Sequence, residues 1–148
     1  MRAVLDTTIL VSAIRSRYGA SKAVVDLVLE QRLTLLMDYR IACEYREVML
    51  RPAHVAASHL HFEQIVALLD ELEGLAEEIE IDFRHRPLSS DPEDDRILDV
   101  AINGSADAIV TSNLRHFVKP AADFGIDVVD AKTILFRIRQ RGDYGSSR

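Results

Sequence analysis

Three acidic residues that lie far apart in the sequence, Asp6, Glu44 and Asp94, stand at positions where a carboxylate needs a partner. Asp6 closes a short apolar run, and an aspartate at the end of a buried strand must be paired, hydrogen-bonded or metal-bound to stay charged. Carboxylates gathered in one pocket repel one another unless a cation neutralises them. Oxygen-only ligands suit Mg²⁺ or Mn²⁺, and these ions keep waters that substrate phosphates can displace. The chemistry that follows is metal-dependent phosphodiester hydrolysis.

Glu44 is selected by its place on an expected helix. Residues 40–50 have helical spacing, with Ile41, Tyr45 and Val48 in one apolar stripe. Glu44 falls at the edge of that stripe, whereas Glu47 points away from it. A carboxylate at the margin of a buried face predicts a partner at that margin, although a plain surface glutamate is the alternative.

A helix that begins near Asp91 carries the remaining acids. Asp91 is its expected N-cap and is followed by proline and further acids, all of which suit a helix start. Asp94 precedes Ile97 by one turn and is therefore expected on the inward face, with Asp95 at the margin and Asp99 one turn behind it. Capping alone is the alternative role for the first acids of this helix.

The elements that must position these residues alternate between strands and helices. Apolar runs predict strands over residues 3–6, 33–37, 108–111 and 126–129, and alternation predicts an edge strand over 77–83. Spacing and caps predict helices over residues 7–14, from Ser21, over 40–50 up to Pro52, over 61–72, over 91–103, and from the cap Asp130 to 140.

Alternating strands and helices with continuous apolar strands indicate a three-layer α/β/α sandwich with a mostly parallel central sheet. Ligands of such sheets bind beyond the carboxyl ends of the strands. Asp6 and the segment Thr111–Asn113 follow two strands at that edge, so Asn113 is expected opposite the three acids. We expect one domain over residues 1–140 and a flexible tail over 141–148.

The charge and composition exclude several classes of protein. The net charge of −6 argues against binding nucleic acid over a broad basic surface, but not against an acidic metal pocket with basic residues at its rim. One cysteine cannot form an internal disulfide or a cysteine-based zinc site. No apolar stretch approaches the length of a membrane span, and we expect a cytoplasmic protein. The five histidines form no metal-ligand framework and are interpreted as surface or packing residues.

The order and spacing of these residues resemble the PIN-domain ribonucleases, in particular the VapC-like toxins of toxin–antitoxin systems. The resemblance covers nearly the whole chain and is carried by VLDTTILVSA at 4–13, EYREV at 44–48 with the following Arg51 and Pro52, DPEDD at 91–95, Ala101, and ADAIVTSN at 106–113.

This resemblance implies that Asp6, Glu44 and Asp94 coordinate the metal, Mg²⁺ or Mn²⁺. Asn113 takes the place of a fourth, more variable acid, and Thr111 orients ligands nearby. It further implies an RNA substrate, a homodimer and a small antitoxin partner.

Two departures from the family pattern matter for the metal site. Thr8 replaces the usual asparagine and is expected to loosen how Asp6 is held. Asn113 removes one negative charge, which favours a single tightly held ion, and Asp95 is expected to compensate in part.

Two other families with acids at strand ends fit this sequence poorly. A haloacid-dehalogenase-like phosphatase needs a second acid at the position of Thr8, and a receiver domain needs paired acids early in the chain and a lysine after Thr111. The serious alternative is a degenerate PIN domain that binds RNA or a protein without cutting, because the fourth acid is lost.

Overall fold

The computed structural model describes the backbone of residues 1–83 and 91–146, and the side chains of those residues up to 142. Its centre is a sheet of five parallel strands in the order β3-β2-β1-β4-β5. The strands are β1 (Arg2–Leu5), β2 (Thr34–Met37), β3 (Glu77–Glu78), β4 (Ala108–Val110) and β5 (Asp127–Val129). The expected sandwich is confirmed, and its sheet is entirely parallel.

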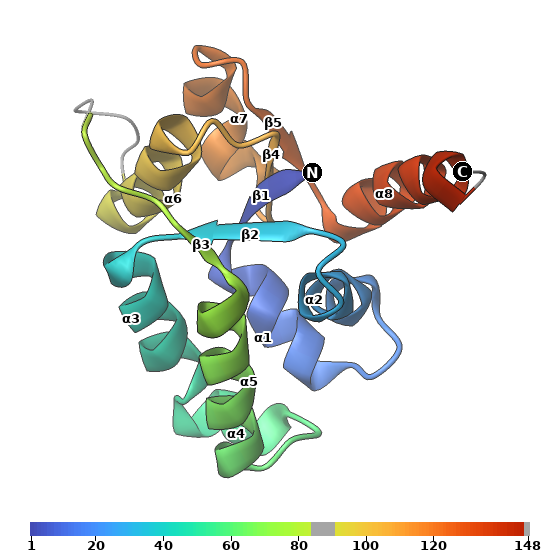
Figure 1. Ribbon diagram of the computed structural model, residues 1–148. Coiled ribbons are helices and arrows are strands. Elements are labelled where there is room, and N and C mark those ends of the chain that lie inside the picture. The colour runs from blue at the N-terminus through green and yellow to red at the C-terminus, as the bar shows by residue number, and fades with distance from the viewer. Residues whose placement is uncertain (84–90, 147–148) are drawn as a thin grey trace.

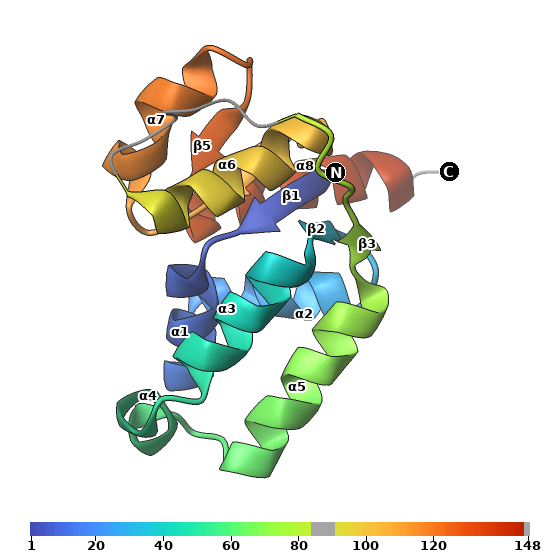
Figure 2. The ribbon, with the colours of Figure 1, turned by 90° about the vertical axis from the view of Figure 1, so that its left-hand side faces the viewer.

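Helices cover both faces of this sheet, as Figures 1 and 2 show: α6 and α7 lie on one side, and α1, α2, α3, α4 and α5 lie on the other. The helix α8 packs against α2. The described helices are α1 (Thr7–Arg15), α2 (Ala20–Leu29), α3 (Tyr39–Met49), α4 (Pro52–Ala57), α5 (Phe62–Leu75), α6 (Pro92–Asn103), α7 (Leu114–Ala122) and α8 (Ala131–Ser146).

Burial explains why the strands read as continuous apolar runs. Ala3, Val4 and Leu5 of β1 are fully buried, as are Ile109 and Val110 of β4. A central strand of a parallel sheet is covered on both faces, so every side chain along it must be apolar. The core therefore lies on both sides of β1 and β4, and their carboxyl ends form one fixed edge.

Side chains at the helix starts fix where three helices leave that edge. Asp38 accepts a hydrogen bond of 2.9 Å from the backbone N–H of Ile41 and begins α3. Asp91 accepts one of 2.9 Å from Glu93 and begins α6, as predicted. Asp130 caps α8 in the same way. Such caps satisfy backbone donors that the helix leaves free.

Several boundaries differ from the sequence prediction. Gly19, not Ser21, is the N-cap of α2, and Ser21 lies buried within that helix. The edge strand expected over 77–83 is shortened to Glu77–Glu78. The helices α4 and α7 were not predicted, and α8 ends at Ser146 rather than near residue 140. Within the described part of the chain, no helix is long and apolar enough to cross a membrane.

Candidate metal centre

Asp6 stands at the carboxyl end of β1 and is held there by hydroxyls from two elements. Thr8 Oγ1 donates a hydrogen bond of 2.9 Å to Asp6 Oδ2, and Thr111 Oγ1 donates one of 2.7 Å to the same oxygen. Thr111 is fully buried, and the same hydroxyl accepts a bond from the backbone N–H of Asn113. Among the described residues, none donates to Asp6 Oδ1.

The expectation that Thr8 loosens Asp6 is therefore wrong. The hydroxyl of Thr8 reaches the carboxylate directly, and it also accepts a hydrogen bond of 3.1 Å from the backbone N–H of Ser112. Thr8 thus joins the start of α1 to the segment after β4. This contact depends on the local turn after β1, which the residue type alone does not reveal.

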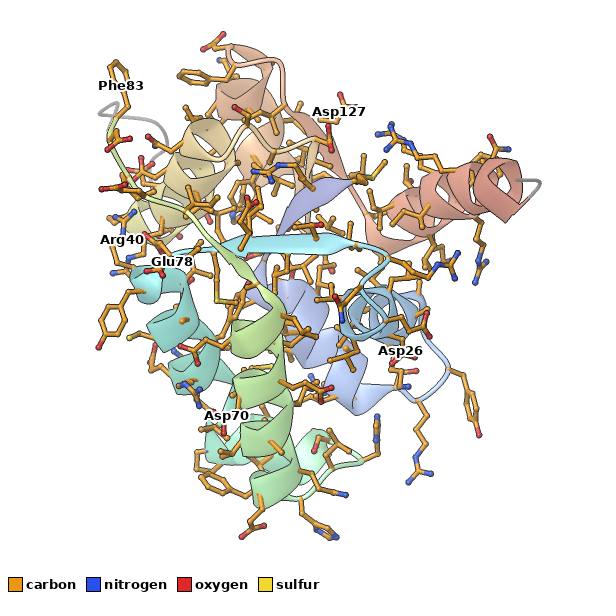
Figure 3. All side chains as sticks on the ribbon, in the orientation of Figure 1. Asp26, Arg40, Asp70, Glu78, Phe83 and Asp127 are labelled. Atoms are coloured by element: carbon orange, nitrogen blue, oxygen red, sulfur yellow. The ribbon has the colours of Figure 1, made fainter. Side chains whose placement is uncertain are left out.

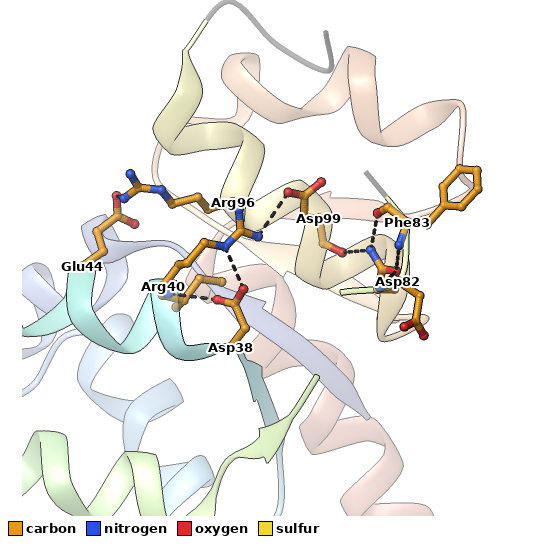
Figure 4. Close-up of polar contacts among 9 residues, drawn as sticks. Asp38, Arg40, Glu44, Asp82, Phe83, Arg96 and Asp99 are labelled. Atoms are coloured by element: carbon orange, nitrogen blue, oxygen red, sulfur yellow. Dashed lines mark hydrogen bonds and ion pairs between the residues drawn. The ribbon is translucent and has the colours of Figure 1, made fainter. Parts of the chain in front are cut away.

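Glu44 is brought to the same edge by its neighbour on α3. The Tyr45 hydroxyl donates a hydrogen bond to the carbonyl oxygen of Leu5, which fastens α3 to the end of β1. Glu44 itself is only 7% exposed, more deeply buried than the edge of a stripe predicts. Within the described residues its Oε1 atom has no hydrogen-bond partner. Arg96 Nη1 lies 3.6 Å away, beyond hydrogen-bond distance (Figure 4).

Burial is the main reason why the pKa of Glu44 rises from 4.5 to about 7. The negative charges of Glu93 and Asp6 raise this pKa further, and Arg96 acts against them. A carboxylate in this position is costly to keep charged near neutral pH unless a cation is close.

Asp94 lies in the first turn of α6, and its side chain is 15% exposed. Its pKa is raised first by burial, then by the charges of Asp91 and Asp6, whereas His116 lowers it. His116 Nδ1 lies 3.3 Å from Asp94 Oδ2. Asp6 therefore interacts electrostatically with both Glu44 and Asp94.

The inward and marginal positions on α6 are partly reversed relative to the prediction. Asp95, expected at the margin, is 6% exposed, and Asp99 is fully buried. Asp99 accepts a hydrogen bond of 3.2 Å from Arg40, which also bonds Asp38 at 2.9 Å (Figure 4). Asp99 thus belongs to a second polar cluster, Asp38–Arg40–Asp99, at the join of β2, α3 and α6.

Two further predicted residues, Asn113 and Asp91, stand at helix starts. Asn113 is exposed and is the N-cap residue of α7, without a cap bond from its side chain. Asp91 accepts the cap bond of α6. Sequence reasoning did not place Arg96 and His116 beside the acids, and His85 lies outside the described residues.

Asp6, Glu44 and Asp94 lie near one another, but their side chains as they stand do not form a complete metal-binding site. Within the described residues, no three histidine, cysteine, aspartate or glutamate side chains are grouped closely enough to hold a metal ion as they stand. Glu44 lies beside the cationic side chain of Arg96, and Asp94 lies beside the imidazole of His116. Chemically, this edge offers carboxylate oxygens in a partly buried setting, which suits a hard divalent cation.

Comparison with known proteins agrees with this architecture. A family model described as PIN domain matches residues 2–115, from β1 to the start of α7. The crystal structure of VapBC2 from Rickettsia felis bound to a DNA fragment from their promoter matches with a TM-score of 0.55 and 20% identity, covering 88% of this chain and 98% of that one. No curated protein matches the sequence. The solved structure supports the fold, and the family model spans more than half of the chain, so this chain belongs to the PIN-domain family.

Proposed function

We propose that this chain is a Mg²⁺- or Mn²⁺-dependent endoribonuclease that hydrolyses phosphodiester bonds of RNA. The observation that carries this proposal is the carboxylate of Glu44, which is buried and whose Oε1 atom accepts no hydrogen bond among the described residues, with Arg96 Nη1 as an ion-pair neighbour at 3.6 Å. A buried carboxylate oxygen that accepts no hydrogen bond is costly. A divalent cation bound at these acids would offset that cost.

The donor set fits such an ion. Asp6, Glu44 and Asp94 supply only carboxylate oxygens, and all three come from elements that meet at the carboxyl edge of the sheet. Arg96 and His116 stand beside two of these acids, and we propose that they move away when the ion binds. The ion would supply an activated water and stabilise the departing oxygen.

The chain's own residues orient this site. Thr8 and Thr111 hold Asp6 from two sides, which leaves the carboxylate little rotational freedom. Asn113 carries no charge where a fourth acid would stand, and this favours one ion over two. Asp91 caps α6 and so fixes the helix turn that presents Asp94. Support residues of this kind set the geometry of metal ligands.

We further propose that the chain is a cytoplasmic toxin that forms a homodimer and is neutralised by a small antitoxin. The resemblance of its motifs to VapC-like toxins supports this role, and the similar solved structure is a VapBC2 assembly on promoter DNA. Co-expression with the product of the neighbouring reading frame tests it. We expect the two proteins to purify together and the growth defect caused by this chain alone to disappear.

A cleavage assay on single-stranded RNA tests the nuclease itself. We expect cleavage with Mg²⁺ or Mn²⁺, none with EDTA, and none in Asp6→Asn or Asp94→Asn. Glu47→Gln is the matched control, because Glu47 is an exposed acid on the same helix as Glu44. If the wild-type chain cleaves no class of RNA with either metal, the binding-only alternative is favoured. The uncharged Asn113 is the reason for considering that alternative.

A further inference from the structure

A cavity of about 420 Å³ adjoins the candidate metal centre. Thr7 and Thr8, which directly follow Asp6, line it from the start of α1, and Val48 lines it from α3. Val48 comes one helical turn after Glu44. The cavity is therefore next to two of the proposed metal ligands and is bounded by three helices, α1, α3 and α4, the last through His54.

The lining of this cavity suits an anionic, partly apolar ligand. Val11 and Val48 provide apolar surface, Ser12 and Ser16 provide hydroxyls, and Arg15 provides a guanidinium group. No carboxylate is among the described residues that line the cavity, although the chain has 24 acidic and 18 basic residues. A phosphate can approach here without meeting a fixed negative charge in the wall.

One face of α1 runs from the proposed metal ligands to the guanidinium group of Arg15. Thr8, Ser12 and Arg15 follow one another at intervals of four and three residues, which places them on the same side of the helix. The distance along the axis from Thr8 to Arg15 is about 10 Å. Within the described part of the chain, no hydrogen bond or ion pair engages the Arg15 side chain, which is exposed.

We propose that this cavity is a subsite for one nucleotide of single-stranded RNA, next to the phosphodiester held at the metal centre. The inference rests on the proposed function. Val11 and Val48 pack against the base or ribose, and Arg15 binds the flanking phosphate through a charge-assisted hydrogen bond. A single strand is required because a base in a duplex stays stacked and cannot enter a pocket.

Binding in EDTA tests the subsite without any cleavage. Fluorescence anisotropy of a short labelled oligouridylate at low salt compares the wild type with Arg15→Gln. We expect a loss of affinity of about tenfold, and a salt slope that is smaller by about 0.7, because one phosphate contact is removed. Arg17→Gln is the matched control: it removes the same charge two residues later but does not line the cavity, and it should stay within about twofold.

Filling the cavity tests its shape separately from its charge. Ser12→Phe places a large side chain at an exposed position of the lining and should lower affinity by about tenfold without changing the salt slope. Ala53→Phe is its control, since Ala53 is exposed on α4 and does not line the cavity, although the next residue, His54, does. Thermal unfolding of all four variants shows that each is folded.

The outcomes distinguish this inference from the proposed function. In an active enzyme, Arg15→Gln and Ser12→Phe should raise KM and leave kcat nearly unchanged, because both lie outside the metal ligands. Equal affinity of the Arg15 and Arg17 variants, with Ser12→Phe binding like wild type, overturns the subsite even when RNA is cut. Selective loss of binding in a chain that cuts no RNA supports the subsite and overturns the nuclease. A wild-type chain that binds no RNA overturns the subsite.

Discussion

Among single residues, Glu44 has the environment least suited to an isolated charge. Its buried Oε1 atom accepts no hydrogen bond among the described residues, Asp6 and Glu93 add negative potential, and Arg96 forms only an ion pair with it at 3.6 Å. The chain tolerates this arrangement at a cost in stability. Such costs are typical of functional sites, where a ligand later supplies the missing interaction.

Replacing Glu44 by glutamine should therefore stabilise the metal-free protein. The amide keeps the shape of the side chain and removes the charge, so we expect Glu44→Gln to raise the free energy of unfolding in EDTA at pH 7.5 by about 1–2 kcal/mol. Urea unfolding measures this change. Glu47→Gln, an exposed change on the same helix, should stay within about 0.5 kcal/mol. A destabilised Glu44→Gln would show that Glu44 supports the fold instead of a ligand.

The raised pKa of Glu44 also predicts how stability depends on pH. Folding raises this pKa from 4.5 to about 7, so between these values the folded chain binds more protons than the unfolded chain. The stability of the metal-free protein must then fall as pH rises through this interval. Burial raises the pKa of Asp94 too, which acts in the same direction.

Urea unfolding in EDTA at pH 5.5 and 7.5 measures this slope, and the difference between wild type and Glu44→Gln isolates the part due to Glu44. We expect the variant to lose less stability over this interval. Mg²⁺ should stabilise the wild type more at pH 7.5 than at pH 5.5, because the ion competes with protons for the same oxygens. Equal pH slopes in the two proteins would be inconsistent with the raised pKa.

Between elements, two arginines of α3 make similar contacts in different surroundings. Arg40 bonds Asp38 and the fully buried Asp99 of α6 (Figure 4). Arg46 bonds the more exposed Asp70 and Glu73 of α5, and Figure 3 labels Asp70 on that helix. A carboxylate that loses its cation in the interior is costly, but a solvated one is not.

Arg40→Met should therefore lower the free energy of unfolding by about 2–4 kcal/mol, because it removes a cation that is ion-paired with the fully buried Asp99. Arg46→Met, the matched change six residues later on the same helix, should cost less than about 1 kcal/mol. Chemical unfolding at neutral pH compares the two. Equal losses would mean that the Asp38–Arg40–Asp99 cluster does not join α3 to α6.

Hydrophobic patterns predicted the elements that bury a face, and they failed where burial is slight. The helix α4 has no buried side chain. The helix α7 has an apolar stripe, but it is only nine residues long, buries only Phe117 and Ala121, and contains Pro120, which disfavours a helix when the sequence is read alone. The edge strand ends early because β2 ends at Met37, whose carbonyl accepts the last bond, from Ile79. The length of a strand depends on its partner, which the local sequence does not describe.

The sequence predicted which acids form the candidate site, but not which side chains lie beside them. Asp6 and Glu44 follow from strand ends and helical spacing. The helical wheel placed Asp94 on the inward face and Asp95 at the margin, whereas Asp95 is the more deeply buried, because α6 buries a broad face that includes Ile97 and Val100. Arg96 and His116 meet the acids only through packing of α6 against α3 and α7, which is tertiary information.

Over the whole molecule, the charges are arranged against simple binding of a polyanion. The net charge is −6, and the proposed metal ligands concentrate negative charge where the scissile phosphate must lie. The cavity beside α1 has no acidic lining among the described residues, so it offers phosphate a path to that edge. RNA should therefore bind measurably without a divalent ion at low salt, and more tightly after such an ion has neutralised the acids.

This distribution predicts that Asp6→Asn strengthens RNA binding without metal and removes most of the gain in RNA affinity that metal produces. Without divalent ions, the variant has one negative charge fewer at the site and should bind a labelled oligouridylate about threefold more tightly than wild type. With Ca²⁺, wild type should gain about tenfold while Asp6→Asn gains little, since asparagine is a weaker ligand for a hard cation. Anisotropy with EDTA or Ca²⁺ measures both affinities, and a gel checks that the RNA stays intact.

Glu71→Gln, a change at an exposed acid on α5, controls for net charge and should respond to Ca²⁺ like wild type. Because Asp6→Asn must strengthen binding in one condition and weaken the response in the other, misfolding cannot imitate the result, and a wild type indifferent to Ca²⁺ would exclude the metal centre.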